Sequence, residues 1–245
     1  MKAMILAAGL GTRLRPLTES IPKALVSIHG MPIIGIIIRR LINFGFTEII
    51  INLHYLPEKI ISYIETLNLP GINFYFTHET EKILDTGGGI KNARKYLNDG
   101  EPFLVHNVDV ISDIDLYRMY RFHQPAKAMA TLAVKGKNSQ RSLLFDKDWL
   151  LAGWENRNTG ERKFIRPSGR EGLTPTGFCG IHVISPDIFD LMQKTEVFSI
   201  INTYIELAAS YRIYGYPVED NLWMDIGSHK QLEEASQIDP EIYLP

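Results

Sequence analysis

Segments typical of strands and of helices alternate from the first residues of this 245-residue chain. Short apolar or β-branched runs predict strands at Met4–Ala7, Glu48–Asn52, Ile72–Thr77 and Pro102–Asn107. Helix-length segments separate them, at Pro32–Phe44, near Pro57–Leu67 and after the triple glycine 87–89. This alternation is typical of α/β folds that are built on a parallel sheet.

The middle of the chain, about 128–184, has a different pattern. Short β-type runs alternate there with polar turns, at Ala130–Val134, Ser142–Phe145 and Phe178–Ile184. Helices at Ser185–Met192 and Ser199–Ser210, a strand near Arg212–Tyr216 and a last helix with a capping box at Ser228 follow. The chain is thus expected to be an α/β, Rossmann-like three-layer sandwich with a mixed, mostly parallel central sheet and a small antiparallel insertion.

Length and charge limit the classes of protein further. A hydrophobic content of 45% in 245 residues is enough for one core, and one domain over residues 1–245 is expected. The 26 basic and 28 acidic residues nearly balance, so we expect neither nucleic acid nor membrane as a partner. Cys179 is the only cysteine, which fits a reducing cytoplasm. The apolar run at the N-terminus stops at Gly9, which indicates no targeting segment.

A loop rich in glycine and arginine, Leu6–Thr18, directly follows the first predicted strand. Glycine lets the backbone approach a phosphate or a base, while exposed amides and two arginines supply donors and positive charge. A Gly-x-Gly by itself is more often an ordinary strand-to-helix turn. Leu14 stands where a dinucleotide fingerprint needs its last glycine, and no P-loop motif occurs. A dinucleotide-dependent oxidoreductase is therefore disfavoured.

A single lysine lies shortly after this loop, in Pro22-Lys23-Ala24-Leu25. The proline stiffens the backbone just before it. A lone lysine is ordinarily a solvated surface residue. Beside a phosphate loop, Lys23 is instead expected to be a fixed point charge for a phosphate group.

Five motifs in order resemble the signature of the sugar-1-phosphate nucleotidyltransferase family. They are the 6–18 loop with Pro22-Lys23, Leu84-Asp85-Thr86-Gly87-Gly88-Gly89-Ile90, Val105-His106-Asn107-Val108-Asp109, Phe178-Cys179-Gly180-Ile181 and Trp223-Met224-Asp225-Ile226-Gly227-Ser228. The resemblance extends along nearly the whole chain. In its short length and its Thr-Gly-Gly-Gly-Ile motif, the chain most resembles N-acetylmuramate 1-phosphate uridylyltransferases. Mannose- and heptose-1-phosphate guanylyltransferases are the next most similar.

The resemblance implies a role for each group of residues. Nucleotide binding is expected at Leu6, Ala7, Ala8, Gly9, Gly11, Thr12, Arg13, Lys23, Thr86 and Gly88. Substrate binding is expected at Asn107, Glu155, Gly180 and Asn202. Arg13, Lys23, Asp109 and Asp225 are the expected catalytic residues.

Asp109 and Asp225 are the candidate ligands of a Mg²⁺ cofactor. Asp109 is expected at the carboxyl end of a strand, the edge at which open α/β sheets bind ligands, and Asp225 just beyond an apolar run. Magnesium typically takes one or two carboxylates and completes its octahedron with water and substrate phosphates. Each aspartate alone would more often be a turn or cap residue, but their order and flanking residues favour the metal. The seven histidines show no metal-ligand spacing.

The chain also departs from the family pattern. Val108 stands in the middle of the usual Asn-Gly-Asp or Asn-Ser-Asp. A Glu-Lys-Pro segment of larger relatives, whose lysine meets the sugar phosphate, is missing. Glu155 stands near the position of the family's glutamate. Because the lysine is missing, the cation that binds the sugar phosphate is unassigned, and Arg157, Arg166 and Arg170 are the candidates.

The resemblance implies transfer of a nucleotidyl group from a nucleoside triphosphate to a sugar 1-phosphate, giving pyrophosphate and an NDP-sugar for the cell wall. UTP with N-acetylmuramate 1-phosphate or a related hexosamine 1-phosphate is the expected pair, in a monomer or homodimer. The alternative is a GTP-dependent mannose-1-phosphate or heptose-1-phosphate guanylyltransferase. A non-catalytic nucleotide-sugar-binding regulatory protein is the alternative from another class, and retention of all four expected catalytic residues argues against it.

Overall fold

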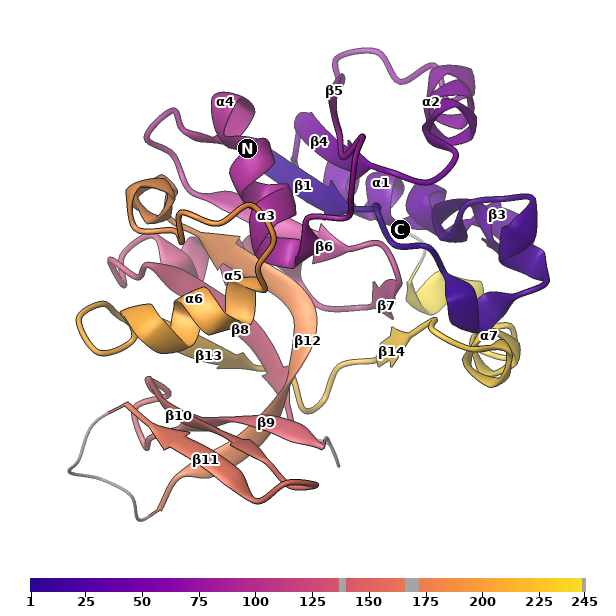
Figure 1. Cartoon of the computed structure of the whole chain (residues 1–245). Helices are drawn as coiled ribbons and strands as arrows, with labels where there is room; N and C mark the ends of the chain where they lie inside the picture. Colours follow the sequence, from indigo (N-terminus) through magenta and orange to yellow (C-terminus); the bar gives the residue numbers. More distant parts are fainter. Residues whose placement is uncertain (137–139, 166–171, 244–245) are drawn as a thin grey trace. The chain divides into compact units, whose positions relative to one another are not determined.

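The structure is a computed structural model that describes residues 1–136, 140–165 and 172–243. The chain divides into two compact units (Figure 1). Unit 1 comprises Met1–Leu84, Val105–Tyr117 and Asn221–Pro245, and unit 2 comprises Asp85–Leu104 and Arg118–Asp220. The expected single nucleotidyltransferase domain over residues 1–245 stays a prediction.

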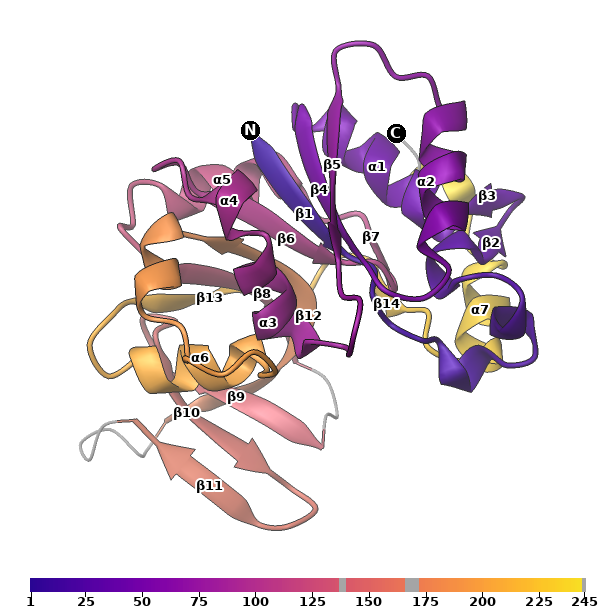
Figure 2. The same ribbon diagram turned by 45° about the horizontal axis from the view of Figure 1, so that its top comes forward.

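Unit 1 is built on the parallel strands β1 (Lys2–Leu6), β4 (Glu48–Leu53) and β5 (Asn73–His78). β1 pairs with β4 and β4 pairs with β5, both in parallel register. Figures 1 and 2 show α1 (Ile33–Asn43) and α2 (Pro57–Thr66) on the same face of these strands. Right-handed crossovers that advance in one direction across a sheet place their helices in this way.

The apolar face of α1 supplies much of the core of unit 1. Ile33, Ile34, Ile36, Ile37 and Ile38 are all buried. The 3-10 turns η1 (Thr12–Leu14), η2 (Leu17–Glu19) and η3 (Lys23–Leu25) and the hairpin of β2 (Ser27–Ile28) and β3 (Met31–Pro32) lie between β1 and α1.

The later parts of unit 1 begin with the end of β6 (Phe103–Asn107) and with β7 (Val110–Ser112). β7 pairs antiparallel with β14 (Trp223–Asp225). Helix α7 (His229–Ala235) and the turn η5 (Pro240–Ile242) end the unit. The predicted cap at Ser228 is confirmed, since its hydroxyl accepts from the Gln231 amide. The Gln231 side chain reaches one residue further back than in a standard capping box, because its Oε1 accepts from the Gly227 amide at 3.1 Å.

Unit 2 contains the expected antiparallel insertion. Its strands are β8 (Ala130–Lys135), β9 (Arg141–Phe145), β10 (Leu151–Asn156), β11 (Glu161–Phe164), β12 (Thr174–Ile184) and β13 (Ile213–Pro217). Antiparallel pairs join β12 to β8 and β9, β9 to β10, and β10 to β11. β13 pairs with β8 in parallel, so the sheet is mixed within this unit.

The helical elements of unit 2 are α3 (Asp85–Asn92), α4 (Arg94–Leu97), α5 (Leu116–His123), which starts in unit 1, η4 (Pro186–Asp190) and α6 (Ile200–Leu207). Two expectations are wrong. The helix expected after the triple glycine 87–89 begins before it, because these glycines lie inside α3. The helix expected at Ser185–Met192 is a 3-10 helix, with Ile188 and Leu191 bonded three residues back.

No helix in the described ranges combines the length and the apolar character needed to cross a membrane.

Candidate active site

The loop after β1 is anchored by a buried polar chain that the sequence motifs do not include. The Ala7 amide donates to Asn52 Oδ1 at 2.7 Å, and Asn52 Nδ2 donates to Glu79 Oε1 at 2.7 Å. Glu79 Oε2 accepts from the Leu84 amide at 2.8 Å. Asn52 lies in β4 near its end and Glu79 follows β5, so both stand at the carboxyl edge of the parallel strands. In the sequence, both are polar residues at the ends of neighbouring predicted strands, and this pattern could have identified them as site residues.

The glycine at position 11 is required by both conformation and space. Its φ is +65°, in the left-handed region that favours glycine. A Cβ there would lie 3.0 Å from side-chain atoms of both Thr18 and Lys23, while the Gly11 carbonyl accepts from the Thr18 hydroxyl at 2.8 Å. A Cβ on Gly9 would instead meet nothing within 4 Å. The loop is therefore packed at Gly11 and open at Gly9. Leu6, Ala7, Ala8 and Thr12, which are also expected to bind nucleotide, all belong to unit 1.

Lys23 and Asp109 form an ion pair at the centre of the unit 1 site. Lys23 Nζ lies 2.6 Å from Asp109 Oδ2, and the two side chains are 10% and 29% exposed. The backbone also holds Asp109 in place, because its carbonyl accepts from the Ile226 amide at 2.6 Å. The neighbouring Val108 amide donates to the Leu6 carbonyl at 3.1 Å. Val108 at this unusual position is buried, and the aspartate still stands at the edge beside β1.

Asp225 lies beside Asp109 through strand pairing. The register of β14 and β7 sets Asp225 opposite Val110, the residue after Asp109. Oδ1 of Asp225 is buried and has no hydrogen-bond partner among the described residues. A buried carboxylate oxygen without a partner is costly unless a ligand satisfies it.

These carboxylates suit a magnesium ion. Two hard oxygen donors are what this ion typically takes from a protein, with water and substrate phosphates completing the shell. Within residues 1–136, 140–165 and 172–243, no group of three or more His, Cys, Asp or Glu side chains is placed to hold a metal. The described residues therefore do not form a metal site in which protein side chains supply most of the ligands.

Arg13 is positioned against the last motif. A Cβ on Gly227 would fall 2.5 Å from a terminal nitrogen of the Arg13 guanidinium, so any side chain at position 227 would displace this end of the arginine. The carbonyl of Arg15 accepts from His229 Nε2 at 2.8 Å, which ties the same loop to the first turn of α7. Unit 1 thus contains Arg13 and Lys23 from the first motif together with Asp109 and Asp225 from two distant ones.

Asn107 ends β6 and is held through its backbone. His106 Nδ1 donates to the Asn107 carbonyl at 2.8 Å. Burial lowers the pKa of His106 to about 4, so the ring is neutral at pH 7. The histidine therefore has a structural contact here and adds no charge beside the carboxylates.

Thr86 and Gly88 lie in unit 2, where their polar groups already have partners. The Thr86 hydroxyl accepts from the Ile200 amide at 3.0 Å, at the start of α6. The amides of Gly87 and Gly88 donate to the Phe198 carbonyl at 2.9 and 3.3 Å. Asn202, in the first turn of α6, belongs to the same block. These glycine amides are hydrogen-bonded within unit 2, and nucleotide binding at Thr86 and Gly88 stays a prediction.

Glu155 and Gly180 also belong to unit 2. Glu155 is buried and forms ion pairs with Arg157 and Arg162 at 3.0 and 3.2 Å. Gly180 has a φ of +74° within the irregular register of β12, between Phe178 and His182. Of the candidates for the phosphate-binding cation, Arg157 is described, and Arg166 and Arg170 lie outside the described residues.

Comparisons with known proteins agree with the motifs. A model of the nucleotidyl transferase family matches residues 2–143. The chain is 33% identical to N-acetylmuramate alpha-1-phosphate uridylyltransferase of Neisseria meningitidis serogroup B, over 97% of this chain and 98% of that protein. It is 31% identical to the mannose-1-phosphate guanylyltransferase catalytic subunit beta of Dictyostelium discoideum, over 94% of this chain and 62% of that longer protein.

Solved structures share the fold. HddC from Yersinia pseudotuberculosis is 24% identical with a TM-score of 0.75, covering 96% of this chain and 98% of that one. UDP-glucose pyrophosphorylase from Acinetobacter baumannii is 19% identical with a TM-score of 0.78, covering 96% and 91%. These likenesses confirm the expected α/β class with its mixed sheet.

Proposed function

Since the chain belongs to the nucleotidyl transferase family, and its relatives are sugar-1-phosphate nucleotidyltransferases, we propose that it joins UTP to N-acetylmuramate 1-phosphate or a related hexosamine 1-phosphate. The products are the UDP-sugar, a precursor for the cell wall, and pyrophosphate. The observation that carries the proposal is the convergence of Arg13, Lys23, Asp109 and Asp225 in unit 1. The single cysteine is in keeping with work in a reducing cytoplasm.

In the proposed reaction, a phosphate oxygen of the sugar 1-phosphate attacks the α-phosphorus of UTP. The new bond joins this oxygen to the α-phosphorus, and the bond to the α,β-bridging oxygen breaks, so pyrophosphate leaves with its electron pair. A phosphate monoester has a second pKa of about 6 and is already largely dianionic at neutral pH, so no general base is needed. Catalysis then depends on positioning and on offsetting charge.

The residues of unit 1 have distinct roles in this scheme. Arg13 and Lys23 neutralise the charge that gathers on the leaving pyrophosphate. Asp109 and Asp225 would hold magnesium, which would supply positive charge to offset that of the substrate phosphates. The Lys23–Asp109 ion pair neutralises both groups before substrates bind. Lys23 exchanges its carboxylate partner for phosphate when the triphosphate arrives.

A GTP-dependent guanylyltransferase is the second candidate, because the chain also matches mannose-1-phosphate guanylyltransferases at about the same identity. The test is an assay of four nucleoside triphosphates against a panel of sugar 1-phosphates, with pyrophosphate release as the readout. We expect the highest kcat/KM with UTP. A higher kcat/KM with GTP would reject the uridylyl assignment, and no pyrophosphate with any pair would favour the non-catalytic binding protein.

A further inference from the structure

A cavity of about 470 Å³ opens on one face of the antiparallel insertion. Its lining includes Leu144, Glu155, Arg157, Arg162, Phe164 and Pro175. The strand registers explain why these residues meet. Leu144 is paired with Gly153 and with Pro175, Gly153 with Phe164, and Glu155 with Arg162. Residues paired across strands project on the same side of a sheet, so apolar and charged side chains share this face.

Glu155 is the centre of the charged part of the cavity. Its side chain is only 10% exposed, and a carboxylate that is so buried needs charged partners. Arg157 Nε lies 3.0 Å from Oε1, and Arg162 lies 3.2 Å from Oε2, so each oxygen has its own guanidinium. Glu155 thereby fixes the placement of both arginines.

The two arginines keep unused donors. A guanidinium carries five N–H groups, and each arginine uses one of its nitrogens on Glu155. Their side chains are 45% and 62% exposed, so the other N–H groups remain accessible. Among the described residues that line the cavity, these three are the charged ones, which leaves one net positive charge. Planar guanidiniums of this kind recognise carboxylates and phosphates.

We propose that this cavity is a subsite for an anionic group of the acceptor sugar, with Arg157 and Arg162 as its ligands and Glu155 as the residue that positions them. The inference rests on the proposed function and names the part of the acceptor that the insertion recognises. Leu144, Phe164 and Pro175 supply the apolar wall for the body of the ligand. The anion is either a carboxylate on the sugar or the 1-phosphate itself. Glu155 acts here through the arginines and not on sugar hydroxyls.

Two acceptors distinguish a sugar carboxylate from the 1-phosphate as the anion that the cavity binds. N-acetylmuramate 1-phosphate carries a lactyl ether with a carboxylate, and N-acetylglucosamine 1-phosphate has a hydroxyl in its place but is otherwise the same. We expect Arg157→Gln and Arg162→Gln each to raise the KM for the muramate acceptor at least ten-fold, with kcat and the KM for UTP little changed. An unchanged KM for the glucosamine acceptor assigns the cavity to the carboxylate, whereas an equal rise for both acceptors assigns it to the phosphate.

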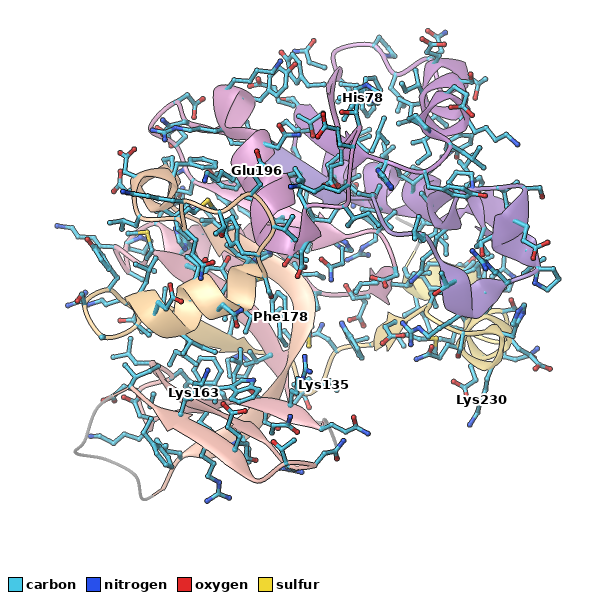
Figure 3. All side chains as sticks on the ribbon, viewed as in Figure 1. His78, Lys135, Lys163, Phe178, Glu196 and Lys230 are labelled. Atoms are coloured by element: carbon cyan, nitrogen blue, oxygen red, sulfur yellow. The ribbon has the colours of Figure 1, made fainter. Side chains whose placement is uncertain are left out.

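Lys163 provides a matched control. Lys163, labelled in Figure 3, neighbours Arg162 on β11, but it pairs with Trp154, and its Nζ lies 5.8 Å from the centroid of that ring. Successive residues of a strand point to opposite faces, so Lys163 lies on the other face from Arg162. Lys163→Gln removes the same charge and is expected to leave both KM values unchanged. Glu155→Gln should raise the KM in the same direction as the arginine variants.

An unchanged KM for both acceptors in both arginine variants would overturn the subsite. A KM change that Lys163→Gln reproduces would also overturn it, because the effect would then be one of general surface charge. If the wild type turns over neither acceptor, the proposed function fails. Calorimetric binding of N-acetylmuramate 1-phosphate to wild type and to Arg157→Gln then tests the subsite, and equal affinities would reject it.

Discussion

The candidate catalytic residues are defined by contacts between single groups. Lys23 pairs with Asp109, Arg13 lies against Gly227, and Asp225 presents a buried oxygen without a described partner. The two contacts each link residues from different motifs. The motifs therefore make predictions that single substitutions can test.

Replacement of either aspartate by alanine is expected to abolish turnover and to leave the fold intact. Asp109→Ala and Asp225→Ala each remove a charged oxygen donor and little core volume. Initial rates of pyrophosphate release would be measured with folding checked by circular dichroism. A folded variant that keeps more than about a tenth of the wild-type rate, a loss below ~1.4 kcal/mol, would contradict the metal role.

Gly227→Ala is expected to lower kcat by displacing Arg13, because the new Cβ would meet the guanidinium at 2.5 Å. The control is Arg13→Ala, which removes the group that is displaced. In the Arg13→Ala background, Gly227→Ala should cost little more, since interacting residues are non-additive. Additive losses in this double-mutant cycle would show that Gly227 acts by another route.

At the scale of elements, packing decides where helices begin. Three glycines in a row disfavour a helix by propensity, yet α3 contains them. The first amides of a helix have no hydrogen-bond partner within the helix. In α3, the amides of Gly87 and Gly88 instead donate to the Phe198 carbonyl, which lies outside the helix. A Cβ on Gly87 would lie 2.3 Å from the Phe198 ring, so the glycine allows close packing.

The buried His123 at the end of α5 predicts a pH dependence of stability. Burial lowers its pKa in the folded protein to about 4 from 6.5, and its Nδ1 bonds with the Thr131 hydroxyl. The unfolded chain therefore takes up the proton first as the pH falls. Stability from this residue is present above pH 6.5 and is lost between about pH 6.5 and 4.

The measurement is the free energy of unfolding by urea across this pH range, for wild type and His123→Gln. Glutamine keeps a hydrogen-bonding group but does not titrate. We expect the wild-type curve to fall more steeply on acidification than that of the variant. Parallel curves would mean that His123 is not buried as a neutral ring.

At the scale of the whole molecule, the residues expected to bind nucleotide are divided between the units. Leu6 to Lys23 belong to unit 1, and Thr86 and Gly88 belong to unit 2. The Thr86 hydroxyl and the amides of Gly87 and Gly88 are bonded within unit 2, and their expected role in binding the nucleotide stays a prediction.

UTP with magnesium is expected to raise the Tm of the protein more than GTP with magnesium at the same concentration. A ligand at 100 times its Kd stabilises by about 2.7 kcal/mol, so a difference in affinity appears as a difference in Tm. Asp109→Ala should reduce the shift, because it removes one expected ligand of the metal. A larger shift with GTP would point to the guanylyl alternative.

The sequence alone determined the α/β class, the antiparallel insertion and the family, because hydrophobic period and ordered motifs are local properties of the chain. It also identified the cap at Ser228, whose two partners are three residues apart. Contacts between distant residues had no such local signal. Only the tertiary structure set Lys23 on Asp109 and joined Asn52 to Glu79. These contacts depend on strand order and register, which bring together groups that the sequence keeps far apart.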